Sequence, residues 1–172
     1  MLCMFAWVLA ATLVAPARAA DPTPGSAAQA VALFLQSCVR YAGDTAGLRQ
    51  AVQQGGYPEV PADHADEYLD GLPGAAYDVS GGQLALVLVS QDSGSCSVLA
   101  DGVRGADVIK ALEAGLRVAR IVFTATDDAP EPQTGDLNNR EYAASRDQQS
   151  WHMLVSTVKD PAGGTAILTT NP

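Results

Sequence analysis

The chain has 172 residues, 48% of them hydrophobic, and a formal net charge of −9 from 19 acidic and 10 basic side chains. This length and composition suit one folded domain with a buried core and argue against extensive disorder. The acidic balance repels phosphate backbones and anionic lipid surfaces. It therefore argues against nucleic-acid binding and is compatible with a basic protein partner or with solubility alone.

Residues 1–19 have the layout of a secretory signal peptide. An apolar run at residues 2–14 is followed by Pro16 and by the tripeptide Ala-Arg-Ala, which puts small residues at positions −3 and −1 of a cut after Ala19. No Lys or Arg precedes the run, and the alternative is a buried N-terminal helix of a cytosolic domain. We predict export to the periplasm of a Gram-negative type cell or secretion. The run is shorter than the roughly 20 residues of a bilayer span, so no membrane span is expected in the mature chain.

Export changes the cysteine count and the charge. Cleavage removes Cys3 and leaves Cys38 and Cys96, and two cysteines in an oxidising compartment most often pair. We therefore predict a Cys38–Cys96 disulfide. The alternative is a free Cys96 thiol that works with His152 as a catalytic dyad. Cleavage also removes Arg18, which leaves 9 basic and 19 acidic residues and a net charge of about −10.

Two helices are predicted near the mature N-terminus. Residues 20–25 are expected to form a flexible leader, after which Ser26 can cap the first helix. Its apolar positions follow the i, i+3, i+4, i+7, i+8 spacing and are Val31, Phe34, Leu35, Cys38 and Val39. A second, shorter helix is expected to begin at a cap on Asp44 or Thr45 and to end at Gly55-Gly56 in a left-handed cap.

Strand patterns begin in the middle of the chain. Residues 63–72 are expected to hold one helical turn. Residues 76–80 and 83–90 are predicted to form a β-hairpin around Gly81-Gly82, because paired glycines supply the positive φ angles of such turns. Both faces of residues 84–89 are apolar, which predicts a strand covered on both sides. A short strand at residues 95–99 contains Cys96.

The second half predicts one helix and four strands. The helix spans residues 106–118, and its apolar stripe has helical spacing. Residues 127–139 are polar, contain two prolines and are expected to form a long acidic loop. The predicted strands are residues 120–126, 141–146, 151–159 and 165–170, with a turn at 160–164 between the last two.

These elements predict an α+β fold in which residues 26–172 form a single domain. Short turns favour antiparallel pairing, so we expect a mostly antiparallel sheet with two N-terminal helices and one internal helix packed on it. The order of elements is loosely similar to that of profilin-like or PAS-like sandwiches. The resemblance covers element order alone and implies no function.

Few residues carry recognisable chemistry. Asp63, His64, Asp66 and Glu67 could gather a cation if their loop turned correctly, but a solvated acidic loop is the simpler interpretation and the one we favour. There is no Gly-x-Ser-x-Gly elbow and no glycine-rich phosphate loop, so no catalytic residue, metal ligand or cofactor is predicted.

Three further residues have simple structural interpretations beside a functional one. Trp151 at the start of a strand is either a core side chain or the edge of a ligand pocket. Arg140 is expected to form a local ion pair. Asp92 is explained by turn chemistry, although a carboxylate at a strand end can also act as an acid or base.

Three classes of function stay open. The first is a non-enzymatic protein-binding module with a basic envelope protein as partner, either of the inhibitor or immunity type or an accessory of an envelope assembly. The second is a small-ligand-binding module, and the third is an envelope hydrolase with an unrecognised site. A large apolar cleft with convergent polar groups would favour the second or third class. A flat acidic surface without a pocket would favour the first.

Overall fold

The computed structural model describes residues 25–82, 84–130, 137–158 and 164–171. The predicted signal peptide at residues 1–19 and residues 20–24 of the predicted leader lie outside this part of the chain. So do the middle of the predicted acidic loop and most of the predicted turn at 160–164.

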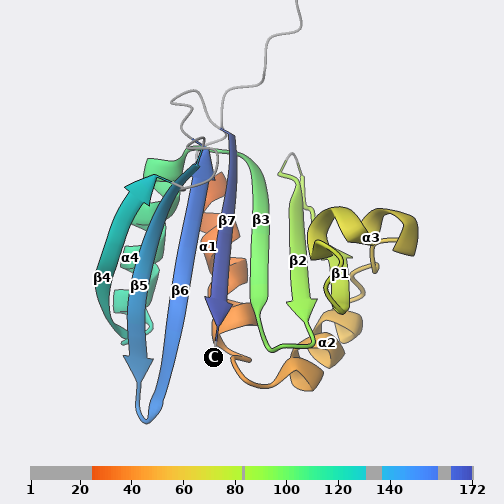
Figure 1. The fold of residues 1–172 in the computed structure, drawn as a ribbon, viewed down its shortest axis with the longest axis horizontal. Coiled ribbons are helices and arrows are strands. Elements are labelled where there is room, and N and C mark those ends of the chain that lie inside the picture. The colour runs from red at the N-terminus through yellow and green to blue at the C-terminus, as the bar shows by residue number, and fades with distance from the viewer. Residues whose placement is uncertain (1–24, 83, 131–136, 159–163, 172) are drawn as a thin grey trace, which may run out of the picture.

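The fold is an α+β arrangement built on one seven-stranded antiparallel sheet, as the sequence predicts (Figure 1). The strand order is β1-β2-β3-β7-β6-β5-β4, and every neighbouring pair is antiparallel. The strands are β1 (Gly74–Asp78), β2 (Leu86–Gln91), β3 (Cys96–Val103), β4 (Val122–Pro130), β5 (Leu137–Arg146), β6 (Gln149–Val158) and β7 (Gly164–Asn171).

Two meanders make up this sheet, and one seam joins them. Strands β1 to β3 form the first meander and β4 to β7 the second. Strands that are consecutive in sequence pair with each other except β3 and β4, and β3 pairs instead with β7. There Cys96 pairs with Thr170 and Val98 with Leu168. The helix α4 (Gly105–Val118) carries the chain from β3 to β4 at the far edge. The last strand therefore closes the domain by returning to its middle.

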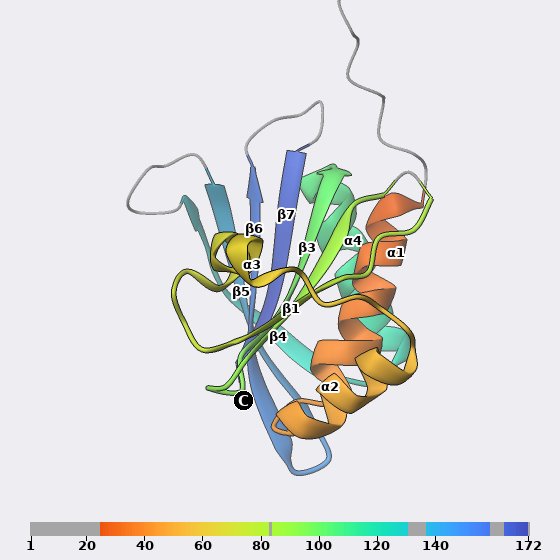
Figure 2. The same cartoon turned by 90° about the vertical axis from the view of Figure 1, so that its right-hand side faces the viewer.

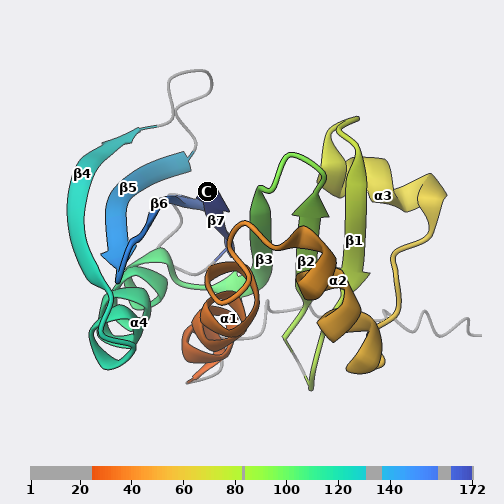
Figure 3. The ribbon, with the colours of Figure 1, turned by 90° about the horizontal axis from the view of Figure 1, so that it is seen from below.

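Helices cover the two faces of the sheet unequally. On one face lie α1 (Ser26–Phe34), α2 (Thr45–Gln54) and α4, while α3 (Ala62–Leu69) lies on the other face beside β1 and β2 (Figures 2 and 3). The sequence predicts only one helical turn at residues 63–72, so α3 is longer than expected. Burial of Leu69, which is 6% exposed, holds the additional turn against the sheet.

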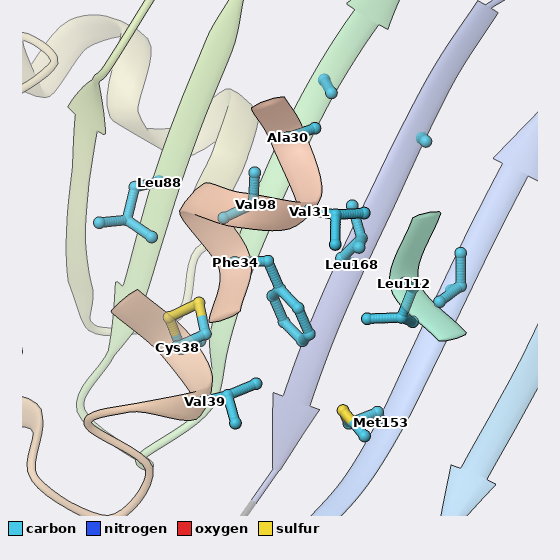
Figure 4. Close-up of a cluster of buried hydrophobic side chains, with 14 of the residues drawn as sticks. Ala30, Val31, Phe34, Cys38, Val39, Leu88, Val98, Leu112, Met153 and Leu168 are labelled. Carbon is cyan, nitrogen blue, oxygen red and sulfur yellow. A yellow bond between two sulfur atoms is a disulfide. The ribbon is translucent and has the colours of Figure 1, made fainter. Parts of the chain in front are cut away.

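The main core lies between α1, α4 and the β3–β7 seam. Phe34 and Val31 of α1 point into this core, which also contains Val98 of β3, Leu168 of β7 and Leu112 of α4 (Figure 4). Fully burying one such side chain stabilises a fold by about 1.5–3 kcal/mol, so this contact is the main attachment of α1.

A glycine allows α1 and α4 to approach each other. A Cβ atom at Gly115 of α4 would lie 2.7 Å from Leu35 Cδ1, inside van der Waals contact. The predicted first helix continues through Leu35 and Cys38, but these residues form a wider π-helical turn, η1 (Leu35–Val39), at the end of α1. Such single turns move side chains around the helix axis without ending the helix.

The predicted disulfide is present between Cys38 of η1 and Cys96 of β3, with a Cα–Cα distance of 5.2 Å. Both residues are buried, and the bond ties the first helix to the seam (Figure 4). The alternative Cys96–His152 dyad is wrong for this structure, because the Cys96 sulfur is bonded to Cys38. His152 is also exposed and follows Trp151, which faces the core, so it lies on the opposite face of the sheet.

The helix caps agree with the sequence in two of three places. The Asp44 side chain accepts a hydrogen bond from the Gly47 N–H at 2.9 Å and caps α2, and Gly56 beyond its C-terminus has φ +75°. The expected Ser26 cap is wrong. Gly25 occupies the N-cap position in a left-handed conformation, and Ser26 is the first helical residue, with its side chain buried.

Strands β4 and β5 extend into the predicted loop at residues 127–139, which corrects that expectation in part. Asp128 lies opposite Arg140 in the β4–β5 ladder, and the two side chains form an ion pair. Arg140 also pairs with Glu113 of α4 at 3.3 Å and donates to the Tyr142 hydroxyl at 2.9 Å. The predicted local ion pair of Arg140 is thus confirmed. Cross-strand pairing outweighs the loop-like composition because it neutralises an acidic strand end.

Replacing both Cys38 and Cys96 with alanine should lower the free energy of unfolding by about 4 kcal/mol, because the disulfide closes a loop with a sequence separation of 58. Urea denaturation of the variant and of the oxidised wild type measures this difference. The reduced wild type is the control and should unfold like the variant. A loss below about 1 kcal/mol would contradict the assigned contribution of the cross-link.

Candidate functional site

A pocket of about 550 Å³ lies between α3 and the face of the sheet that carries α3. Its base is formed by β2 and β3, and its walls are α3 and the segment that leads into it. Figure 2 shows α3 beside these strands, on the side away from α1 and α4. We call this cavity between α3, β2 and β3 the α3 pocket.

The wall of the α3 pocket begins with a strap, residues 58–60, which runs along the outer edge of β1. The Asp78 N–H donates to the Pro58 carbonyl at 2.9 Å, and the Val60 N–H donates to the Ala76 carbonyl at 2.8 Å. An isolated bridge between Glu59 and Tyr77 completes the pairing. The strap therefore satisfies part of the β1 edge and fixes where α3 begins.

The helix α3 is held to the sheet by one apolar anchor. Leu69 packs on Ala76 of β1 and Val89 of β2 in a small second core. The approach is close at Gly74, where a Cβ atom would lie 2.8 Å from Leu69 Cδ2 and 2.6 Å from the Ser90 carbonyl oxygen. A side chain at Gly74 would push α3 away from the strands and alter the pocket.

The base of the α3 pocket is apolar. Ala85 and Val87 come from β2 and its preceding loop, and Leu99 comes from β3, directly opposite Val87 in the ladder. Val60 and the ring of Tyr68 extend this surface up the walls. These side chains are on the face of the sheet away from the main core, so they are left partly open to a ligand.

The rim of the α3 pocket is acidic. It carries the carboxylates of Glu59, Glu67, Asp78 and Asp101, and neither Lys nor Arg is among its described lining residues. All four carboxylates are exposed. Hydrogen bonding by Ser80, first through its side chain and then through its backbone N–H, lowers the pKa of Asp78 below its ordinary value. This carboxylate therefore keeps its charge at a lower pH than an ordinary aspartate does.

The negative charge of the chain is concentrated in one sequence segment, which includes the pocket. Residues 44–101, which contain α2, α3, β1, β2 and most of β3, hold nine carboxylates and one basic residue, Arg49. The rest of the chain holds ten carboxylates and nine basic residues. Nearly all of the net charge of −9 thus belongs to the half of the fold that carries the α3 pocket.

The described lining residues of the α3 pocket do not form a nucleophile-and-base arrangement. The Ser80 hydroxyl accepts a hydrogen bond from the Leu86 N–H at 3.0 Å and donates to the Leu86 carbonyl at 3.3 Å, so it secures the hairpin. His64 is exposed on α3, with its Nδ1 3.4 Å from Glu67 Oε1 and its Nε2 3.8 Å from Asp63 Oδ2. Nucleophilic catalysis requires a nucleophile held by a base, and these contacts do not provide it.

The acidic cluster of the sequence lies on α3. The structure brings His64 and Glu67 to the pocket, while Asp63 and Asp66 do not line it. Among the described residues, no group of three or more His, Cys, Asp or Glu side chains is arranged to hold a metal ion. The solvated-surface interpretation fits Asp63 and Asp66.

The other residues singled out in the sequence have structural surroundings. Trp151 is a buried residue of the main core, as in the first of its two interpretations, and it also lines part of a depression beside β4. Asp92 accepts a hydrogen bond from Arg49 at 2.6 Å, which ties the β2–β3 turn to α2. A second, more open depression of about 520 Å³ lies at the start of β4 and includes Val122 and His152.

Sequence reasoning missed the base of the pocket. Val87 and Leu99 were assigned to strands but not to a site, because a half-buried valine or leucine in a strand has no signature of its own. The signal present in the sequence was the alternation at residues 84–89, which predicted cover on both faces. This alternation did not indicate that α3 would pack over β1 and β2 and leave Val87 and Leu99 partly exposed.

A search against protein-family models found no match to this chain, and searches of curated proteins and of solved structures found no significant match. Separately, no helix within the described ranges is both long and apolar enough to span a bilayer.

Replacing Leu69 with alanine should release α3 without unfolding the domain. The lost anchor costs about 2–5 kcal/mol, and the small second core is separate from the main core. Native-state hydrogen exchange should then show faster exchange at residues 62–69 and little change in β3 and β7. Leu112→Ala, in the main core, is the control and should speed exchange throughout. Unchanged protection of α3 in the Leu69 variant would contradict the anchor.

Proposed function

We propose that this protein is an exported, non-enzymatic binding module that takes a basic side chain of a partner protein into the α3 pocket. The observation that carries the proposal is the combination of an apolar base with four carboxylates on one rim. Lys and Arg have the matching chemistry, because each has an apolar stem and a cationic head. The stem would contact Val87 and Leu99, and the head would reach the carboxylates.

The open shape of the site favours a macromolecular partner. Sites for small molecules bury most of the ligand and place a few polar groups inside an apolar cavity. Here all four rim carboxylates are exposed to solvent. The acidic surface also continues past the pocket along α3, through Asp63, Asp66 and Asp70. A folded partner can contact both the pocket and this surface.

The rim carboxylates are expected to contribute to the rate and specificity of partner binding more than to its affinity. Each exposed ion pair is worth about 0.2–1 kcal/mol, so four such pairs do not make a tight complex without buried apolar contact. The concentrated charge of residues 44–101 would instead raise the rate of encounter with a basic partner. Affinity would come from the apolar base and from the surface around it.

Two features support a proposal about the cell compartment, namely the predicted signal peptide and the disulfide. We propose cleavage after Ala19 and a place in the periplasm or outside the cell. A structural disulfide between Cys38 and Cys96 is typical of oxidising compartments. The partner would then be a basic envelope protein, and the module would act as an inhibitor or immunity-type protein or as an accessory of an envelope assembly.

A second candidate function is binding of a small organic amine. The volume of about 550 Å³ is the observation that favours it, since ligand pockets span about 300–1,000 Å³. The same apolar base and carboxylate rim would hold such a cation.

The protein should bind a peptide with a basic side chain and not one with an acidic side chain, and this binding should require an open α3 pocket. The tripeptide acetyl-Leu-Lys-Leu-amide should shift amide resonances of Val87 and Leu99 in a titration followed by NMR, and the Glu-centred tripeptide should not. Ala85→Trp, which fills the pocket, should abolish these shifts. The matched control is Ala143→Trp, at an exposed alanine of β5. Equal shifts with both tripeptides, or retained shifts in Ala85→Trp, would end the proposal.

Each rim carboxylate should contribute only a small part of the affinity for the Lys tripeptide. Glu67→Gln should weaken binding of the Lys tripeptide about two- to fivefold, the amount expected for one exposed ion pair. Asp66→Asn makes the same kind of change one residue away on α3, outside the pocket, and is the control. A photo-reactive residue at position 67 then distinguishes the two candidate functions in cells. It should capture one basic envelope protein, and an amine-binding module would give no protein adduct.

Export should produce a chain that begins at Ala20. Intact-mass measurement of protein from the periplasm of an exporting host should show this N-terminus and no free thiol, because Cys3 is removed and the remaining cysteines pair. Leu9→Arg, which interrupts the apolar run, should keep the chain in the cytoplasm. An exported chain that retains Met1 would contradict signal-peptide cleavage.

A further inference from the structure

The face of the sheet that carries α3 is bare over its middle strands. The helix α3 packs on β1 and β2 at one end of this face, and α1 and α4 lie along the opposite face (Figure 3). Of the helices that the structure describes, none covers β3, β7 and β6 on the α3 side. We call the outward surface of these three strands and of the neighbouring β5 the open face.

An apolar stripe crosses the open face from the α3 pocket. Val87 of β2, part of the base of the pocket, lies opposite Leu99 of β3, and Leu99 lies opposite Ile167 of β7. Leu154 of β6 adjoins this row on the same face, opposite Thr169. Ile167 and Leu154 are half-buried and belong neither to the main core nor to the small second core. The base of the α3 pocket thus continues across the sheet beyond α3.

The hydroxyl groups beside this stripe have hydrogen-bond partners. The Ser97 and Thr169 hydroxyl oxygens are 2.9 Å apart and share a hydrogen bond, and the Thr165 hydroxyl donates to the Asp101 carboxylate at 2.6 Å. Covering a hydrogen-bonded hydroxyl costs much less than covering an unpaired one. The middle of the open face can therefore be removed from water at low cost, while Asp101 keeps its charge because its partner is neutral.

Carboxylates flank the apolar stripe on both sides. Glu141 of β5 is exposed and lies opposite Leu154, so it belongs to the open face. On the other side, Asp101 of β3 and Glu67 of α3 stand at the rim of the α3 pocket. Within the described part of the chain, none of these three carboxylates is paired with a Lys or Arg side chain. A ligand on the stripe meets uncompensated negative charge along both of its long edges.

The described basic side chains lie away from the open face. Those outside the strands belong to the helices of the opposite face or to the turns beside these helices, and they are Arg40, Arg49, Arg104, Lys110, Arg117 and Arg120. In β5, Arg140 contacts Glu113 of α4. Arg146 lies over the ring of Trp151, a residue of the main core. Both therefore point to the helix side, and the open face repels a second copy of itself and attracts a cationic surface.

The bare strip has the dimensions of one helix. The strands β3, β7 and β6 are two strand spacings apart, about 10 Å in all, and an α-helix with its side chains is about 10–12 Å wide. The central strand β7 has 8 residues. Its length of about 27 Å equals that of a helix of about 18 residues. The seating of Leu69 of α3 on Ala76 and Val89 shows that this face accepts a helix.

We propose that the basic partner of this protein lays an amphipathic α-helix on the open face, along β7 and beside α3. The apolar side of that helix covers Leu99, Ile167 and Leu154. Basic residues on its two flanks meet Glu141 on one side and the acidic rim of the α3 pocket on the other. This arrangement rests on the proposed function, because a lysine or arginine of the second flank is the side chain that enters the pocket.

A designed peptide tests this arrangement. It has about 18 residues, leucines at the i, i+3, i+4 and i+7 spacing, and lysines on both flanks of the leucine stripe. Added to the isotope-labelled protein, it should shift the amide resonances of Ile167 and Leu154. Two control peptides should leave these resonances in place. One has glutamate in place of every lysine, and the other has the same composition in an order that removes the stripe.

Variants of the protein locate the helix. Ile167→Lys should raise the dissociation constant of the lysine peptide about tenfold or more, since an apolar contact is lost and a like charge is added. Val118→Lys makes the same kind of change at an exposed residue of α4 and should leave the constant unchanged. Glu141→Lys, at an exposed site outside both cores, should weaken binding without altering apolar packing. Melting curves of the three variants check that the fold is retained.

Three results would overturn the proposal. The first is no shift with the lysine peptide, or equal shifts with the lysine and glutamate peptides. The second is a dissociation constant that neither Ile167→Lys nor Glu141→Lys changes. The third is a shift of Ile167 and Leu154 with protein concentration alone, which would place a second copy on the open face.

The Lys tripeptide separates this proposal from the proposed function. Shifts of Val87 and Leu99 by the tripeptide, without shifts of Ile167 and Leu154 by the helical peptide, would leave the α3 pocket standing and remove only the partner helix. Ala85→Trp should abolish the tripeptide shifts and keep those of the helical peptide at Ile167. Failure of the tripeptide alone in the wild type would remove the pocket lysine and retain helix binding.

Discussion

The structure depends on the contact between α1 and the β3–β7 seam. Phe34 packs there, and the Cys38–Cys96 disulfide ties the end of the helix to β3. The constraint matters because the sheet consists of two meanders that meet only at this seam. Each meander has local pairing, but their union pairs residues far apart in sequence, which costs chain entropy. The helix and the covalent link offset that cost where the two meanders meet.

Once the seam is closed, the two faces of the sheet take different roles. The face under α1, α2 and α4 is filled by the main core, while α3, over β1 and β2, is the only described helix on the other face. The half-buried Val87 and Leu99 follow from this incomplete cover, and the carboxylates gather on the same side. The α3 pocket is thus a consequence of a short helix placed on a wide sheet. The proposed partner follows from the charge and the apolar base of this pocket.

Much of the fold could be predicted from local patterns. The first helix, the Asp44 cap and the pairing of the central hairpin all rest on local spacing and turn chemistry, although only Gly82 of the predicted Gly81-Gly82 turn has a positive φ, +64°. Expectations failed where distant partners decide. Residues 127–139 have a loop composition, yet Asp128 joins a strand because Arg140 lies opposite. The second turn of α3 likewise needs the contact of Leu69 with Val89.

The sequence by itself determined the α+β class, the antiparallel pairing, the cysteine pair and the acidic character, because periodicity, turn residues and charge are local or additive properties. Only the tertiary structure decided that β7 inserts beside β3, that α3 lies on the second face, apart from the other described helices, and that Val87 and Leu99 lie in one pocket with four carboxylates. These are contacts between segments distant in sequence. Their free energy depends on which surfaces the whole chain buries together, and no single segment carries that information.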